Sequence, residues 1–110
     1  MTLYCGGFNA SNQLGCIFDK KLPHKLDITL EGLKCLTNGE DHTIFVYQNG
    51  SVFALGDDED FTIGTQNRTT YLSPENLDSI ISKEKILYAH CGSFYTAYLI
   101  ESGKIIICSL

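Results

Sequence analysis

Apolar and polar residues alternate in short runs along this chain, which is the period-two pattern of β-strands. Residues 42–48 (HTIFVYQ) are rich in β-branched and aromatic side chains, and residues 51–55 (SVFAL) resume the pattern directly after Asn49 and Gly50. Asn-Gly between two such runs predicts a β-hairpin with a type I′ turn, in which both central residues adopt positive φ.

A second hairpin with the same pattern is predicted near the C-terminus. Residues 96–100 (TAYLI) and 104–108 (KIIIC) flank the turn residues Ser102 and Gly103. Strands of this kind bury at least one face, so their large apolar residues are candidates for the core. The expected core residues are Phe45, Tyr47, Val52, Leu55, Tyr98, Leu99, Ile105 and Ile107.

A further short strand is expected ahead of each hairpin, at residues 33–37 and 86–90. Long polar connections, at about residues 16–31 and 65–85, separate these groups, and each contains one of the two prolines of the chain. No proline therefore lies inside a predicted strand, which supports the strand predictions.

The second connection also contains a helix signal. Residues 74–82 (PENLDSIIS) begin with a proline that follows Ser73, and proline at the first helical position after a serine cap is typical of a helix start. The sequence predicts a short helix here.

The chain contains an internal repeat of about fifty residues. Residues 3–15 (LYCGGFNASNQLG) align with residues 52–64 (VFALGDDEDFTIG) at an offset of 49, which is 52 minus 3. Residues 39–52 align with residues 92–105 at an offset of 53, which is 92 minus 39. A period of this length indicates a repeat architecture whose units bury their apolar faces against each other.

These residues resemble the repeats of the regulator-of-chromosome-condensation family, whose approximate pattern is Gly-x-x-His-Thr, an apolar strand, x-Gly-x-Val, then Gly-x-Asn-x-x-Gly-Gln-Leu-Gly. The resemblance covers almost the whole chain. Asn12 and Asp60 stand where the family has glycine before Gln-Leu-Gly, and Tyr95 stands where the second copy would have histidine. The turn and repeat-signature residues are Gly7, Gly15, Gly39, His42, Thr43, Gly50, Gly56, Gly64, Gly92, Thr96 and Gly103.

The resemblance implies an all-β fold, a partial β-propeller of about two four-stranded antiparallel blades in a single repeat domain, residues 1–110. Repeat one spans about residues 3–51, repeat two about 52–104, and a terminal strand 104–110. Two repeats cannot close a seven-bladed ring, so open blade faces and unpaired strand edges are expected to favour association. A fragment, a self-assembling chain and a subunit of a larger complex remain as alternatives.

Composition narrows the function classes. The net charge of −5 argues against general binding to nucleic acid or anionic membranes, because both require clustered Lys and Arg. No apolar run is long enough for a membrane helix, and MTLYCGGFN lacks the pattern of a secretory signal. Five cysteines without close spacing fit a reducing compartment. These features predict a cytoplasmic or nuclear location.

No motif of an enzyme is present, so we expect no catalytic residues, no cofactor and no metal site. His42 belongs to the repeat signature, where a structural role is expected. His90 and Cys91 are adjacent, and neighbours on a strand point to opposite faces, which argues against a shared site. Cys5, Cys35 and Cys108 are interpreted as small buried apolar residues.

The most distinctive local feature is an acidic run. It consists of Asp57, Asp58, Glu59 and Asp60, directly after Gly56, and Phe61 follows it. Such a run fits a solvated turn, a docking patch for a basic partner or a weak calcium site, and carboxylate density alone does not separate these. The five residues from Asp57 to Phe61 are the candidate partner-binding residues.

The sequence therefore predicts a non-catalytic protein–protein interaction module that docks through open blade faces. Its partner would be another protein or copies of itself, rather than nucleic acid or a membrane. The alternative that the resemblance implies is a guanine-nucleotide exchange factor or regulator for a small GTPase, an activity that needs the broad face of a whole propeller.

Overall fold

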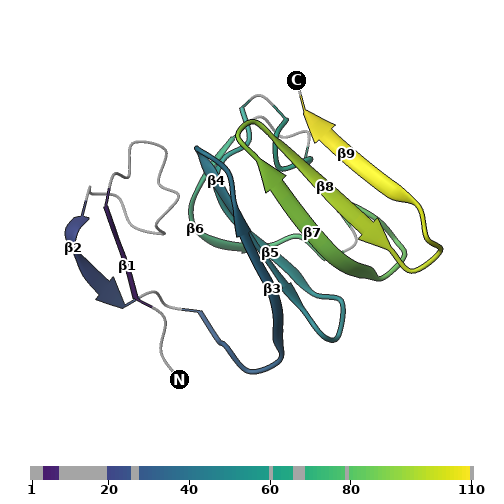
Figure 1. The fold of residues 1–110 in the computed structure, drawn as a ribbon, viewed down its shortest axis with the longest axis horizontal. Helices are drawn as coiled ribbons and strands as arrows, with labels where there is room; N and C mark the ends of the chain where they lie inside the picture. The colour runs from purple at the N-terminus through teal and green to yellow at the C-terminus, as the bar shows by residue number, and fades with distance from the viewer. Residues whose placement is uncertain are drawn as a thin grey trace.

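The fold consists of antiparallel strands arranged in three sheets (Figure 1). The computed structural model describes residues 4–7, 20–25, 28–59, 61–65, 69–78 and 80–109, and this part of the chain contains strands and no helix. No helix among these residues is long and apolar enough to span a membrane. The strands are β1 (Tyr4–Gly7), β2 (Lys20–Lys25), β3 (Leu33–Asn38), β4 (His42–Tyr47), β5 (Val52–Asp57), β6 (Thr70–Asn76), β7 (Ile86–Gly92), β8 (Tyr95–Ile100) and β9 (Ile105–Ser109).

Neighbouring strands in each sheet follow one another in the chain. β1 pairs with β2, β3 to β6 form a four-stranded sheet, and β7 to β9 form a three-stranded sheet. In Figure 1 the four-stranded sheet stands between the other two, and β7 lies against β3 and β4. The expected strands at residues 33–37, 42–48, 51–55, 86–90, 96–100 and 104–108 are confirmed to within two residues at each end.

The internal repeat is present in the strand registers. Leu33 pairs with Tyr47 in β3–β4, and Ile86 pairs with Ile100 in β7–β8, so both numbers rise by 53. The register shift that follows Leu33 recurs after Ile86, and the β8–β9 pairing repeats the β4–β5 pairing at the same offset. The β7–β9 sheet therefore reproduces the first three strands of the β3–β6 sheet.

The β1–β2 pair reproduces the other half of that sheet. Tyr4 pairs with Lys25 and Phe53 pairs with Asn76, which gives an offset of 49 along β1 and 51 along β2. The register shift between Cys5 and Gly7 corresponds to the shift between Ala54 and Gly56. β1 and β2 are thus equivalent to β5 and β6, the last two strands of the four-stranded unit.

The hairpin turns differ from the type I′ prediction. Tyr47 N–H donates to Ser51 C=O at 2.9 Å and Gly50 N–H donates to Tyr47 C=O at 2.9 Å, so the loop has three residues rather than two. Gly50 has φ of 91°, whereas Asn49 is not among the residues with positive φ. Ile100, Gly103 and Lys104 repeat these bonds, and Gly103 has φ of 89°. The prediction of a two-residue turn was wrong because a single left-handed glycine closes a three-residue loop.

The predicted helix at residues 74–82 is also wrong. Residues 70–76 form β6, and Pro74 lies within it. Among the described strands β6 pairs only with β5, and Leu72, Ser73 and Pro74 all fall opposite Leu55, in the register shift between Ala54 and Gly56. Proline is tolerated there because an edge strand with a bulge leaves its missing N–H without a required partner. Pro23 occupies the corresponding place in β2.

The main core lies between the β3–β6 and β7–β9 sheets. Among the predicted core residues, Phe45, Tyr47, Val52, Leu55 and Tyr98 are buried, and Leu99 is half-buried. Ile105 and Ile107 were predicted wrongly, because their side chains are 64% and 67% exposed. The core cluster consists of Ile44, Val46, Val52, Ala54, Ile63, Leu77, Ile86, Ala89, Cys91, Tyr98 and Ile100.

Candidate functional site

The outer face of the β7–β9 sheet is apolar and exposed. Side chains alternate along β9, so that Ile106 and Cys108 pack against the core while Ile105 and Ile107 point the other way. Tyr88, Leu99 and Ile105 form one cross-strand row on the outer face, and His90, Ala97 and Ile107 form the next. Tyr88 is 51% exposed, which leaves a large aromatic surface beside the two isoleucines.

The equivalent face of the middle sheet is buried. Subtracting 53 from Ala97, Leu99, Ile105 and Ile107 gives Ile44, Val46, Val52 and Ala54, which are 0%, 0%, 1% and 0% exposed. The β7–β9 sheet covers these four residues and forms the core with them. The outer face of β7–β9 thus repeats, in register, a surface that is completely covered one sheet earlier.

Hydrogen bonds hold the two sheets together around this core. Cys91 N–H donates to Thr37 Oγ1 at 3.0 Å, and Glu40 N–H donates to Ser93 C=O at 3.1 Å. The thiol of Cys35 donates to the carbonyl of Ala89 at 3.2 Å. Each of these bonds joins a residue of one sheet to a residue of the other, so they fix how the two sheets pack against each other.

His42 lies at the same junction. It is completely buried, and its Nε2 lies 2.8 Å from Thr96 Oγ1 of the next sheet, with which it forms a hydrogen bond. Its Nδ1 has no hydrogen-bond partner among the described residues. Burial lowers the pKa of His42 below its usual value of 6.5, an effect that the backbone of Tyr95 and then the negative charge of Asp41 oppose. The contacts of the imidazole are those of a structural link between sheets.

The acidic run does not form one exposed patch. Asp58 is completely buried, and its Oδ1 accepts hydrogen bonds from the N–H groups of Ile63 at 2.8 Å and Gly64 at 3.0 Å. Its Oδ2 accepts from the Thr65 N–H at 3.0 Å and from the Thr65 hydroxyl. The carboxylate therefore organises the loop that follows β5.

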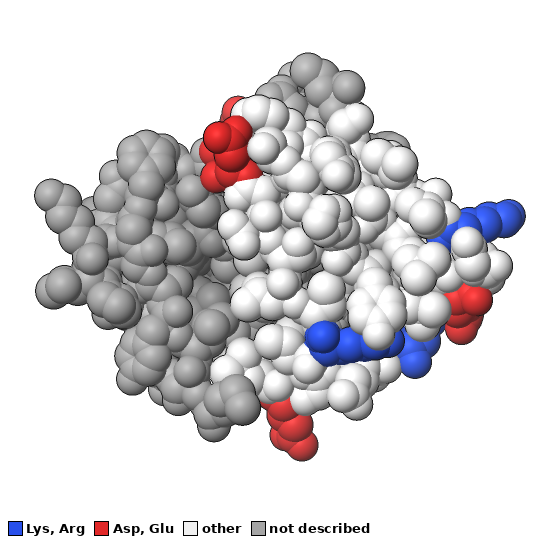
Figure 2. Space-filling model, viewed as in Figure 1, with Lys and Arg blue, Asp and Glu red and all other residues white. Residues whose placement is uncertain are grey.

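The other members of the run lie around this loop. Asp57 is half-buried and its Oδ1 accepts a hydrogen bond of 2.7 Å from the N–H of Glu59, whose side chain is exposed. Phe61 is half-buried and has φ of 63°. Asp60 lies outside the described residues. On the side viewed in Figure 2, acidic side chains lie at separate places and do not form one continuous surface.

The role of Asp58 follows from the alignment, although the acidic run obscured it. Asp58 aligns with Asn9 at the offset of 49, and asparagine stands at this place in the repeat pattern that the sequence resembles. An amide oxygen and a carboxylate oxygen can both accept backbone N–H bonds in a loop. Two tyrosines add to the same network: Tyr71 donates to Thr65 Oγ1 at 2.9 Å and Tyr98 donates to Ile63 C=O at 2.6 Å.

The remaining signature residues occupy turns, loops and the sheet junction. Gly7 ends β1, and Gly15 lies outside the described residues. Gly39 and Gly92 lie at the junction, where a Cβ on Gly39 would collide with the Gly92 carbonyl and the His42 ring. Thr43 lies in β4, Thr96 contacts His42, and Gly56 and Gly64 flank the Asp58 loop. The described residues contain no group of three or more His, Cys, Asp or Glu side chains arranged to hold a metal ion.

Together these observations define an incomplete β-propeller. In the part of the chain that the structure describes, one four-stranded blade is followed by the first three strands of a second and preceded by two strands of another. No protein-family model matches the sequence. The chain is similar in structure to human WBSCR16, with a TM-score of 0.77 and 24% identity. It is also similar to yeast RCC1 (Prp20) bound to Kap60, with a TM-score of 0.81 and 17% identity.

A second structure of Prp20p from Saccharomyces cerevisiae matches with a TM-score of 0.78 and 17% identity. In all three comparisons 96% of this chain is covered, but the chain spans only 27–28% of the length of the matched proteins. The fold is therefore that of RCC1-like repeats, as the sequence resemblance implied, and it corresponds to a little over a quarter of such a propeller.

Proposed function

We propose that this chain is a non-catalytic protein–protein interaction module that docks through the outer face of the β7–β9 sheet. The observation that carries the proposal is the contrast between equivalent residues: Val52 is 1% exposed, whereas Ile105, which holds its place in the next sheet, is 64% exposed. A contiguous apolar face of this kind favours association with another protein surface.

The chemistry of this face supports docking rather than catalysis. Tyr88, Leu99, Ile105 and Ile107 offer aromatic and aliphatic surface, which is enriched in the centres of protein interfaces. Lys34 Nζ lies 4.4 Å from the centre of the Tyr88 ring, so one cation lies beside this aromatic residue at the margin of the outer face. One protein of this fold is known with a protein partner, since a matched structure holds Prp20 bound to Kap60.

The proposal is tested by charging the face. In the double variant Tyr88→Lys/Ile105→Lys two apolar side chains of the outer face become cations, and both residues are exposed, so the fold should tolerate the change. The matched control is Leu36→Lys/Leu72→Lys, which charges two residues of similar exposure, 47% and 50%, on other strands. The immobilised wild-type chain and the control variant should retain equal amounts of the same partner protein. The face variant should retain at least tenfold less of it. Equal recovery by the face variant would reject this docking surface.

The exchange-factor alternative has its own test. The likeness to Prp20, whose binding to Gsp1p and histones was described with its structure, is the observation that favours it. If it holds, catalytic amounts of the chain accelerate the release of labelled GDP from a candidate GTPase. Saturating amounts that leave the release rate unchanged for a set of small GTPases would end this alternative and leave the interaction module.

A further inference from the structure

The free edge of β9 is a second feature that lies apart from the outer face. Among the described strands β9 pairs only with β8. Hydrogen-bonding direction alternates along an antiparallel strand. In the middle sheet the groups that face β6 belong to Val52 and the residues two apart from it, because Leu77 N–H donates to Val52 C=O at 2.8 Å. Ile105, Ile107 and Ser109 lie 53 residues further along the chain and occupy the equivalent positions in β9. Their N–H and C=O groups therefore point to the free edge.

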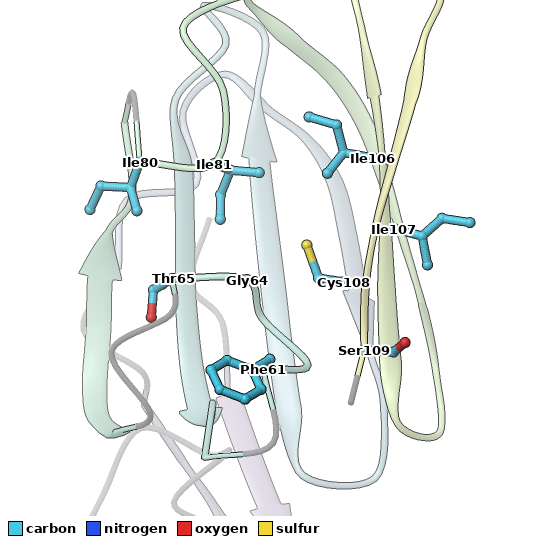
Figure 3. A pocket seen from close by; sticks show the side chains of 9 residues that line it. All are labelled: Phe61, Gly64, Thr65, Ile80, Ile81, Ile106, Ile107, Cys108 and Ser109. Carbon is cyan, nitrogen blue, oxygen red and sulfur yellow. The ribbon is translucent and has the colours of Figure 1, made fainter.

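A cavity of about 660 Å³ lies beside this edge (Figure 3). Ile106 and Cys108 point into it from β9, while Ile107 points away, and Ile81 and Phe61 line it from the segments that flank β6. The Asp58 loop approaches β9 closely, because a Cβ on Gly64 would lie 2.5 Å from Cys108 Sγ. The cavity thus has an apolar wall and a strand edge on one side.

The middle sheet shows what such an edge accepts. β6 pairs antiparallel with β5 and inserts Leu72, Ser73 and Pro74 opposite Leu55. Cys108 holds the place of Leu55 in β9, since it pairs with Thr96 as Leu55 pairs with Thr43. A strand added to β9 in the register of β6 would therefore place the equivalents of Leu72, Ser73 and Pro74 opposite Cys108, which lines the cavity. Apolar side chains at these positions would suit the apolar wall.

The acidic residues near the cavity indicate which end of an added strand would carry basic residues. The Asp58 loop lies across the cavity from β9, because Gly64 and Thr65, whose N–H groups bond to the Asp58 carboxylate, line the cavity together with Phe61, Cys108 and Ser109. Asp57 and Glu59 are the sequence neighbours of Asp58 in this loop. Burial raises the pKa of the Cys108 thiol, and the negative charge of Asp58 adds to that effect, so the field of the loop reaches β9. β9 runs toward this loop, so an antiparallel strand begins there.

We propose that the edge of β9 and its adjacent cavity bind an extended segment of another protein, antiparallel to β9, with basic residues at its N-terminal end and apolar residues opposite Cys108. Main-chain bonds supply the affinity of such strand addition, and the cavity and charge supply its specificity. This site is the edge of the sheet, whereas the function proposed above uses its outer face, so either can fail without the other.

Two peptides taken from the chain itself provide probes. Residues 18–27 (FDKKLPHKLD) and 69–78 (TTYLSPENLD) contain the equivalent strands β2 and β6. With capped termini and neutral histidine they carry charges of +1 (three lysines, two aspartates) and −2 (one glutamate, one aspartate). We expect peptide 18–27 to bind the 110-residue chain at least tenfold more tightly than 69–78 in fluorescence anisotropy at low salt. The difference should shrink at high salt.

Amide exchange measured by NMR locates the binding. The N–H groups of Ile105, Ile107 and Ser109 should gain protection at least tenfold on addition of peptide 18–27, whereas those of Ile106 and Cys108 already bond to β8. Ser109→Pro removes one outward N–H and should weaken binding at least tenfold. Peptide 18–27 methylated at alternate backbone nitrogens makes the same test without altering the protein. The variant Tyr88→Lys, which changes the outer face, should bind peptide 18–27 with an affinity within twofold of that of the wild-type chain.

The charge requirement has a matched pair of variants. Asp57→Asn/Glu59→Gln should weaken peptide 18–27 but not 69–78, and Glu84→Gln/Glu101→Gln, which removes two charges from exposed glutamates near the opposite end, should leave both unchanged. Equal binding of a scrambled 18–27 peptide, or binding that survives both Ser109→Pro and backbone methylation, would overturn the proposal. So would a self-associated chain that Ser109→Pro converts to a monomer, because the occupant would then be a second copy.

Discussion

The carboxylate of Asp58 holds the loop between β5 and β6 through three backbone N–H groups. In Asp58→Ala these donors lose their acceptor within a closely packed loop, and we expect the free energy of unfolding to fall by about 3 kcal/mol. Asp58→Asn keeps one acceptor oxygen and matches Asn9 of the first repeat, so its loss should be about 1 kcal/mol. Urea denaturation gives both values. Equal losses in the two variants would show that the carboxylate does not organise the loop through these bonds.

His42 makes the stability of the chain depend on pH. Because burial lowers its pKa in the folded protein, the unfolded chain binds the proton more readily as pH falls below about 6.5. The stabilisation is complete above that pH and is lost as pH falls toward the folded pKa. Unfolding measured between pH 7.5 and 5.5 should show this decrease in wild type.

The control for this prediction is the exposed histidine. His90→Gln should keep the pH dependence, and His42→Gln should lose most of it. The imidazole titration of His42 followed by NMR provides a reading that does not depend on the variant folding. An ordinary titration midpoint for His42 would contradict the burial argument.

Gly50 and Gly103 occupy equivalent turns with nearly equal φ, 91° and 89°. A Cβ on Gly50 would lie 2.7 Å from Lys85 Cγ, whereas a Cβ on Gly103 would meet nothing within 4 Å. Gly103→Val should therefore cost only the backbone conformation, about 1–2 kcal/mol, and Gly50→Val should cost more because Lys85 must move. Thermal unfolding of both variants tests this, and an unchanged melting temperature for Gly50→Val would refute the assigned turn.

At the scale of the element, the third strand of each repeat meets a different environment. Val52 in β5 and Ile105 in β9 share one register position, yet only Val52 is covered by a neighbouring sheet. Val52→Lys buries an unpaired ammonium group and should cost at least about 3 kcal/mol. Ile105→Lys should change stability by no more than about 0.5 kcal/mol. Chemical denaturation of the two variants measures the difference, and similar losses would mean that both faces are buried in solution.

The strands differ in how well the sequence predicts them. β4, β5, β8 and β9 are dense in β-branched and aromatic residues and were predicted within two residues. β6 was missed because a serine followed by proline is a stronger local signal for a helix start than for an edge strand. The bulge that accommodates Pro74 exists only because β5 lies alongside, and no local pattern encodes that neighbour.

For the molecule as a whole, the outer face of β7–β9 should govern association. As the concentration of protein or sulfate increases, the absolute mass measured by size exclusion with light scattering should rise for the wild-type chain. It should rise less for Tyr88→Lys/Ile105→Lys. Apolar surface is removed from water on association, and two cations on the same face oppose it. Equal masses for the two proteins at every concentration would show that this face stays exposed and takes no part in self-association.

The sequence by itself determined the repeat and the main strands, because alternation and turn glycines such as Gly50 and Gly103 are local properties. Its resemblance to known repeats implied the RCC1-like fold. Only the tertiary structure decided which equivalent residues are buried. Val52 and Ile105 have the same local pattern, and Asp58 stands within a run of four acidic residues, but burial depends on segments remote in the chain. The candidate docking face and the β9 edge follow from that difference, because a surface is defined by what does not cover it.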